Sequence, residues 1–315
     1  PAMRHVDFDI LRRALAALLV LACTVSAASC GKTPEPAQAP LRVMLIPADG
    51  GTATGTLADF APLFEAVGEQ TGLEFDLKVG QSYSAVVEAM KAGLVDVAWL
   101  GPVAYVQARD AGAAELLAVS VLDDQSVYYA AIFVPRDSPL TGIDQLRGKA
   151  VAFGDVNSGS SFTYQVAMML EQGLDPARDL GAIRLTGSHA ASLSALAEGQ
   201  VDAACLSFES YLRAVDSGSV PADAFRVLAR SDPIPNPPLV LHTALPAPLK
   251  RTLRQAFGRV HERVANPEMI RGYGGKRVDR YDAGFAEAAF DGPARTLARI
   301  DDDVRAAILR KAAER

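Results

Sequence analysis

One short stretch of the sequence combines hydroxyl and amide side chains in a pattern that can bind an anion. Residues 150–153 form an apolar strand, Gly154 ends it, and a helix is predicted over residues 162–172. Either Asn157 or Ser158 can cap that helix, and both are candidate ligand contacts. The first helical turn would then direct free backbone N–H groups and the positive end of its dipole toward one space. Such a helix start favours an anion, although an ordinary capped helix with nothing bound fits the same residues.

The hydroxyl groups of Ser158, Ser160 and Ser161 add further donors to this helix start. Gly159 between them carries no side chain that would keep a ligand away from the backbone. The candidate site therefore consists of neutral donors contributed by neighbouring residues.

The elements that must position this stretch follow from short apolar strands alternating with helices. Strands are predicted at residues 41–47, 73–79, 95–100, 116–122, 150–153, 183–185 and 201–206. Helices are predicted at residues 57–70, 82–91, 162–172 and 188–198. This alternation is typical of α/β proteins and predicts mainly parallel sheets flanked by helices.

The alternation is interrupted at residues 128–135 and starts again, which predicts two lobes. The first lobe would comprise residues 41–127 and 242–315, and the second residues 128–241. Extended segments at 128–135 and 239–241 would cross between them. Two α/β lobes joined by paired crossings can close on a small ligand between strand ends and helix starts.

The N-terminal residues predict export and membrane attachment. Arg4, Arg12 and Arg13 precede an apolar run over residues 14–28, which is short for a membrane-spanning helix. Small residues then lead to Cys30, and a proline-rich segment follows to residue 40. This resembles a bacterial lipoprotein signal at residues 1–29, with lipid on Cys30 and residues 30–40 as a tether. A plain secretory signal is the alternative.

Composition excludes several other classes of function. Half of the residues are hydrophobic and the net charge is −6, so we expect a globular protein without a nucleic-acid partner. The four histidines show no metal-binding spacing, and no Gly-x-Ser-x-Gly motif is present. Residues 50–55 have the two-glycine spacing of a phosphate-binding loop, but Thr56 stands where its lysine would be. We therefore expect no catalytic residues, metal or cofactor, and we also expect a monomer.

Six segments, taken in order, resemble the phosphate, phosphite and phosphonate-binding proteins of ABC importers. The segments are residues 81–90, 95–102, 128–129, 153–158, 187–189 and 201–204. The resemblance runs from about residue 41 to residue 240. It implies a type II periplasmic-binding-protein fold with two lobes and two crossing strands. It also implies an extracytoplasmic protein that delivers a phosphorus oxyanion to an ABC permease.

The resemblance also assigns ligand-binding roles by motif. They fall on Tyr83 of the first lobe, Tyr128 of the crossing, Ser158 and Ser160 of the helix start, and His189. Glu209 aligns with one of two acidic residues that hold the amine of aminoalkyl phosphonates in the family.

The second of those acidic residues is replaced here by Pro237. This departure weakens the case for a cationic ligand, and phosphite, phosphate, an amine-free phosphonate or another small anion stay open. A sensor that presents its ligand to a signalling partner is the alternative to an importer. The basic segment 271–280 is predicted to be a solvated loop.

Overall fold

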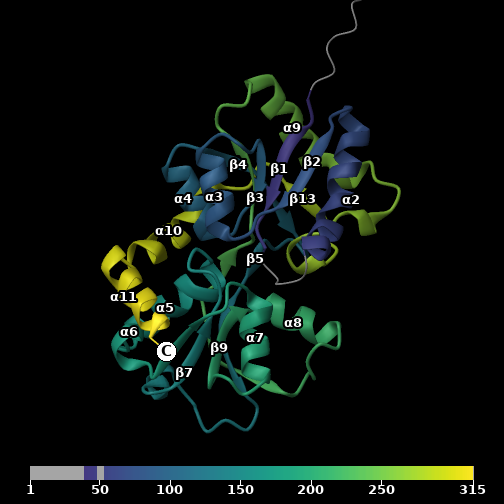
Figure 1. Cartoon of the computed structure of the whole chain (residues 1–315). Coiled ribbons are helices and arrows are strands. Elements are labelled where there is room, and N and C mark those ends of the chain that lie inside the picture. The colour runs from purple at the N-terminus through teal and green to yellow at the C-terminus, as the bar shows by residue number, and fades with distance from the viewer. Residues whose placement is uncertain (1–38, 48–52, 315) are drawn as a thin grey trace, which may run out of the picture. The chain divides into compact units, whose positions relative to one another are not determined.

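Strands and helices alternate along residues 39–47 and 53–314, which the computed structural model describes. The predicted signal peptide, Cys30 and almost all of the tether lie outside these residues. Residues Pro40–Arg315 belong to one compact unit with two large sheets, each flanked by helices (Figure 1). The predicted α/β class with two lobes is therefore confirmed. Among the described residues, no helix has both the length and the apolar character needed to cross a membrane.

The first lobe is built on a six-stranded sheet in the order β13-β4-β12-β3-β1-β2. Its strands are β1 (Leu41–Leu45), β2 (Phe75–Val79), β3 (Val97–Trp99), β4 (Ala114–Val121), β12 (Leu239–His242) and β13 (Arg280–Asp282). Its helices include α2 (Ala53–Thr71), α3 (Tyr83–Lys91), α4 (Pro102–Asp110) and α9 (Ala247–Arg259). Aromatic side chains from strands and helices fill its core, with Phe60 against Trp99 and Phe64 against Phe257.

The second lobe is built on a five-stranded sheet in the order β10-β6-β9-β7-β8. Its strands are β6 (Ala130–Pro135), β7 (Ala150–Phe153), β8 (Ala182–Leu185), β9 (Ala203–Ser207) and β10 (Phe225–Arg230). Its helices include α5 (Tyr164–Glu171), α6 (Pro176–Asp179), α7 (His189–Ala197) and α8 (Phe208–Asp216). Side chains alternate between two cores, so Val151 and Phe153 face one while Ala152 faces the other.

Both sheets are mixed, whereas the sequence predicts mainly parallel ones. In the first lobe β1 runs parallel to β2 and β3, but β12 and β13 are antiparallel to their neighbours. In the second lobe β7 runs parallel to β8 and β9, but β6 is antiparallel to β9 and β10. The alternation of strands and helices in the sequence predicts the parallel strand pairs. It does not predict the direction of β6 and β12, because each of these strands enters its sheet directly after a crossing between the lobes.

Two short strands, β5 (Val127–Tyr128) and β11 (Ile234–Pro235), pair as an antiparallel ribbon where the chain passes between the lobes. The predicted crossing at residues 128–135 therefore continues into β6 of the second sheet. The predicted return crossing at residues 239–241 is instead β12, which lies between β3 and β4 in the first sheet. The sequence did not predict β11, because this short crossing strand lies in a proline-rich segment before β12.

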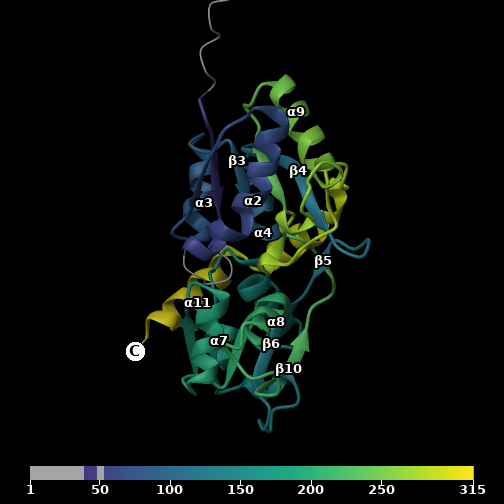
Figure 2. The same cartoon turned by 90° about the vertical axis from the view of Figure 1, so that its right-hand side faces the viewer.

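The sequence predicts that residues 242–315 complete the first lobe. In the structure, not all of the C-terminal helices belong to that lobe. Helix α10 (Asp291–Ala298) packs against both α4 and α5, and α11 (Asp302–Ala313) packs against β8 and α6 of the second lobe. Figure 1 and Figure 2 both show α11 beside helices of the second lobe. Ile300 and Ile308 are buried in that lobe's core. Helical periodicity identifies an apolar face but not the lobe that covers it.

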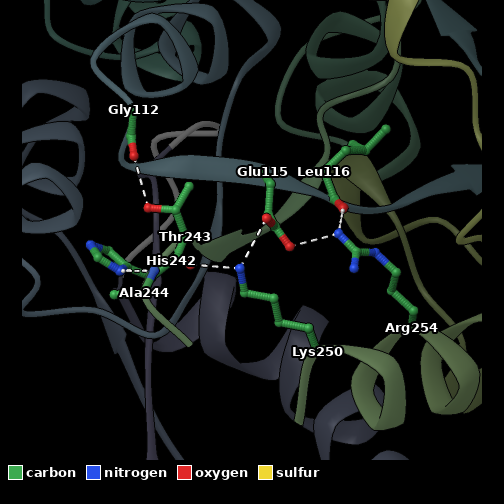
Figure 3. Close-up of polar contacts among 8 residues, drawn as sticks. All are labelled: Gly112, Glu115, Leu116, His242, Thr243, Ala244, Lys250 and Arg254. Atoms are coloured by element: carbon green, nitrogen blue, oxygen red, sulfur yellow. Dashed lines mark hydrogen bonds and ion pairs between the residues drawn. The ribbon is translucent and has the colours of Figure 1, made fainter. Parts of the chain in front are cut away.

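A polar network attaches α9 to the first sheet (Figure 3). Glu115 on β4 accepts hydrogen bonds from Lys250 Nζ at 3.0 Å and from Arg254 at 2.7 Å. Lys250 also donates to the Thr243 carbonyl at 2.6 Å. Burial raises the pKa of Glu115, but the two cations outweigh it and the net pKa is lowered. The carboxylate therefore remains charged and fixes α9 as the chain leaves β12.

The remaining short turns are η1 (Ile143–Leu146), η3 (Val260–Glu262), η4 (Pro267–Met269), η5 (Tyr273–Gly275) and η6 (Glu287–Phe290), with a π-helical turn, η2 (Gly159–Thr163), leading into α5.

Candidate functional site

The predicted helix start is present and Ser158 caps it. The Ser158 hydroxyl accepts the Ser161 N–H at 3.2 Å, and the π-helical turn η2 then continues into α5. Gly154 lies so close to Ser161 that a Cβ on Gly154 would sit 2.2 Å from the Ser161 hydroxyl oxygen. Glycine at the strand end is therefore needed for the close return of the chain. Ser158, Ser160 and Ser161 are all buried.

Tyr128 brings a hydroxyl from the crossing ribbon to this helix start. Its side chain is 2% exposed and is hydrogen-bonded to the Ser160 side chain. Burial raises the pKa of Tyr128, and the Ser160 hydrogen bond only partly offsets this effect. The phenol therefore stays protonated at neutral pH and can donate a hydrogen bond.

His189 begins α7, where Ser188 is the cap. Its Nδ1 accepts the backbone N–H of Ser207 at 3.0 Å, and its ring is 1% exposed. Burial lowers the pKa of His189 to about 3, so the ring is neutral near pH 7. Because Nδ1 accepts a hydrogen bond, the proton resides on Nε2. Nε2 lies 3.4 Å from the Tyr273 hydroxyl and can donate in that direction.

Tyr273 is the main residue that sequence reasoning missed. It lies in the segment 271–280, which the sequence predicts to be a solvated loop, yet Tyr273 is only 7% exposed. Its hydroxyl lies 2.7 Å from Ser207 Oγ and 2.9 Å from Ser210 Oγ. Its ring meets that of Tyr128 edge to face, with centroids 5.4 Å apart. The local sequence carries no signal for this contact, since its partners lie more than 60 residues away.

These contacts define the donor cluster, a set of buried polar side chains from both lobes and the crossing ribbon. Its members are Tyr128, Ser160, His189, Ser207, Ser210 and Tyr273. Ser207 and Ser210 are linked to each other at 2.8 Å, and Ser207 also caps α8. The donor cluster therefore joins β5, η2, α7, α8 and the η5 turn.

Tyr83 and Asn157 lie where the two lobes meet. The Tyr83 N–H donates to the Asp155 carboxylate at 3.3 Å, and the Tyr83 side chain is buried beside Gly101. The Asn157 side chain donates to Ser84 of the first lobe and accepts from Gln107 at 3.2 Å. These contacts make the Asn157 amide a bridge between the lobes, and its ligand contact stays a prediction.

Arg305 of α11 also supports this loop. It donates to the Val156 carbonyl at 3.2 Å and to the Asn157 side-chain oxygen at 3.1 Å. The C-terminal helix therefore helps to fix the loop that precedes the helix start.

Glu209 borders the donor cluster but faces a separate cavity of about 290 Å³. The cavity is lined by Ser120, Leu122, Asp123, Gln125, Val127, Glu209, Asn236, Tyr273, Lys276 and Val278. The Glu209 carboxylate lies 3.5 Å from the Tyr129 backbone nitrogen, which donates to it. The cavity lining thus includes one acidic residue close to the donor cluster, Glu209, and one basic residue, Lys276.

The chemistry of the donor cluster suits an oxyanion. Tyr128, Ser160 and His189 supply neutral hydroxyl and imidazole donors in a buried setting, and a hydrogen bond to a charged oxygen is strong there. Ser161 Oγ is buried with no hydrogen-bond partner among the described residues, so its hydroxyl is uncommitted. Within the same residues no group of three or more His, Cys, Asp or Glu side chains could hold a metal ion.

The chain also resembles known proteins in sequence. Residues 52–285 match the family described as "ABC transporter, phosphonate, periplasmic substrate-binding protein". A phosphate-import protein of Mycolicibacterium smegmatis is 28% identical over 258 residues, which cover 78% of this chain and 79% of the relative. A phosphonates-binding periplasmic protein of Escherichia coli is 25% identical over 186 residues, covering 58% of this chain and 55% of the relative.

Two solved structures share the fold. The binding component of a phosphonate ABC transporter from Pseudomonas aeruginosa superimposes with a TM-score of 0.70 at 20% identity, covering 87% of this chain and 98% of its own. A protein from Prochlorococcus marinus in complex with methylphosphonate has a TM-score of 0.70 at 15% identity, covering 82% and 97%. At these identities the likeness concerns the fold, and it agrees with the predicted two-lobed type II architecture.

Proposed function

The chain belongs to the periplasmic substrate-binding proteins of phosphonate ABC transporters, and from that membership we propose that it captures a phosphorus oxyanion between its lobes. The ligand is a phosphonate, phosphite or phosphate, and an ABC permease receives it. The protein acts by binding and release, as its family does, and carries out no catalysis.

One observation carries this proposal above the others. Tyr128, Ser160 and His189 come from three separate elements, and each is at most 3% exposed. Tyr128 interacts with Ser160 and packs against Tyr273, whose hydroxyl lies 3.4 Å from His189 Nε2. A hydrogen bond to a charged oxygen is stronger than one between neutral side chains, so a tetrahedral oxyanion could replace present contacts of several of these donors at once. Ser158 and Ser161 add the donors of the helix start.

Ligand capture would be coupled to closure of the two lobes. Tyr83, Asp155 and Asn157 already join the lobes beside the helix start, and Asp59 pairs with Arg213 at 2.7 Å across the other side. A bound oxyanion that contacts both lobes favours the closed arrangement, because those contacts form only there.

Titration calorimetry with phosphate, phosphite, methylphosphonate, 2-aminoethylphosphonate and sulfate tests the proposal. We expect at least one phosphorus oxyanion to bind, and to bind more tightly than sulfate. Preference for the amine-bearing ligand that is lost in Glu209→Gln would assign the amine to Glu209. If folded protein binds none of the phosphorus compounds, the proposed function is wrong.

We also propose that lipid on Cys30 anchors the protein outside the cytoplasmic membrane. Support comes from the small residues before Cys30 and the proline-rich segment after it. Expression in a bacterial host followed by fractionation tests this point. Cys30→Ala is expected to move the protein out of the membrane fraction, and an unchanged distribution would leave plain secretion as the explanation.

A further inference from the structure

Tyr273 is the residue shared by the donor cluster and the cavity beside it. Its hydroxyl bonds to Ser207 and Ser210 and lies near His189, as described above. The same side chain lines the cavity of about 290 Å³ that Glu209 and Lys276 also border. The Tyr273 side chain therefore stands between the buried donors and this cavity.

The surrounding turn holds Tyr273 in a defined position. Gly275 has a φ of +68°, and a Cβ there would lie 2.4 Å from an oxygen of Asp59. Only glycine permits this approach, so the turn rests directly on the carboxylate that pairs with Arg213. The ring itself packs against Trp99 with centroids 5.8 Å apart and against Tyr128. A side chain fixed by contacts on several sides can act as a rigid wall.

The cavity would be large enough for a ligand substituent if the wall were removed. One water molecule takes up about 30 Å³ of liquid, so about 290 Å³ holds several non-hydrogen atoms. Val127 and Val278 contribute apolar surface to the cavity. An alkyl chain attached to phosphorus could lie there only by passing the position of the Tyr273 ring.

We propose that Tyr273 is a specificity-determining residue that restricts the site to compact phosphorus oxyanions. The proposal rests on the proposed function and adds the substrate class: phosphite, phosphate and short-chain phosphonates bind, and phosphonates with longer alkyl chains are excluded. The ring sets this limit by its bulk, while its hydroxyl links the two lobes through Ser207 and Ser210.

The test compares dissociation constants for phosphate, methylphosphonate, ethylphosphonate and propylphosphonate. In the unsubstituted protein, affinity is expected to fall from methyl- to propylphosphonate. In Tyr273→Ala the ratio of propyl- to methylphosphonate affinity should rise, by about fourfold for each methylene that becomes buried. Tyr273→Phe keeps the ring and should keep the original ratio, although its affinity for every ligand can fall.

Tyr211→Ala is the matched control. Tyr211 is also 7% exposed, but it packs within the second lobe against Phe133 and Phe208. Its loss should reduce stability without changing the ratio. If Tyr273→Ala fails to fold, Tyr273→Leu provides the same comparison with a smaller loss of packing.

The outcomes separate this inference from the proposed function. A ratio in folded Tyr273→Ala or Tyr273→Leu equal to that of the unsubstituted protein would overturn the inference alone. Equal affinity of the unsubstituted protein for methyl- and propylphosphonate would do the same. Failure of the unsubstituted protein to bind any of the four ligands would overturn the proposed function, and the inference with it.

Discussion

Replacing Tyr128 with phenylalanine is a specific test of the donor cluster. The substitution removes one hydroxyl and keeps the ring, which is 2% exposed and packed against Tyr273. No large cavity is created, so the fold should tolerate the change. The lost group is the one hydrogen-bonded to Ser160 at the helix start.

The expected loss of affinity follows from the charge of the ligand. A hydrogen bond from a neutral donor to a charged group contributes about 1.5–3 kcal/mol, which corresponds to a dissociation constant about ten to a hundred times higher. Burial strengthens the expectation, because no water can replace the missing donor without entering the closed site. The free energy of unfolding of the ligand-free protein should fall by only about 1 kcal/mol, the typical net contribution of one hydrogen bond.

Tyr105→Phe is the matched control for this experiment. Tyr105 is also a fully buried tyrosine, but its hydroxyl donates to Glu287 at 2.6 Å and it packs against Phe290 in the first lobe. Calorimetry with the tightest phosphorus oxyanion, together with urea unfolding, should show weaker binding for Tyr128→Phe and only lower stability for Tyr105→Phe. A dissociation constant for Tyr128→Phe within twofold of the unsubstituted value would refute the assignment of Tyr128 to the ligand.

Three further predictions concern pH, closure and stability. Burial lowers the pKa of His189 from 6.5 to about 3, so the unfolded chain binds more protons between these values. The free energy of unfolding should therefore fall as pH drops below about 6.5, by up to about 1.4 kcal/mol per pH unit, and urea unfolding should show a shallower dependence in His189→Gln. Arg213→Met removes the ion pair with Asp59 and should increase the rate of ligand dissociation about fivefold, which stopped flow can measure. An unchanged rate would show that this ion pair does not stabilise the closed arrangement. Glu115→Gln should lower the free energy of unfolding by about 1–2 kcal/mol, because Glu115 accepts hydrogen bonds from Lys250 and Arg254 of α9 (Figure 3). Ligand affinity should not change, and altered affinity would contradict this prediction.

Local features of the candidate site could be predicted from the sequence. The strand that ends at Gly154, the cap at Ser158 and the buried hydroxyls that follow depend on neighbouring residues, so their pattern is visible in a short segment. The same holds for His189 after its cap at Ser188. The family resemblance then brought Tyr128 into the same site.

Other parts of the site depend on contacts between distant residues. Tyr273 reaches Ser207 over a separation of 66 residues, and Arg305 reaches Asn157 over 148. Asn157 itself has the residue type of a helix cap, but its amide bridges to Ser84 and Gln107 because the lobes meet there. No local pattern records such contacts.

The sequence by itself determined the α/β class, the two lobes and the capped helix start at Ser158, because hydrophobic periodicity and capping act over a few residues. Tertiary structure alone decided the mixed direction of the sheets, the short β5–β11 crossing and the placement of α11 on the second lobe. It also decided that Tyr273, in a glycine-rich turn, is buried against residues of the second lobe. These features depend on which helix and strand surfaces pack against one another. The type of a side chain does not determine its packing partner, because that partner comes from a distant part of the chain.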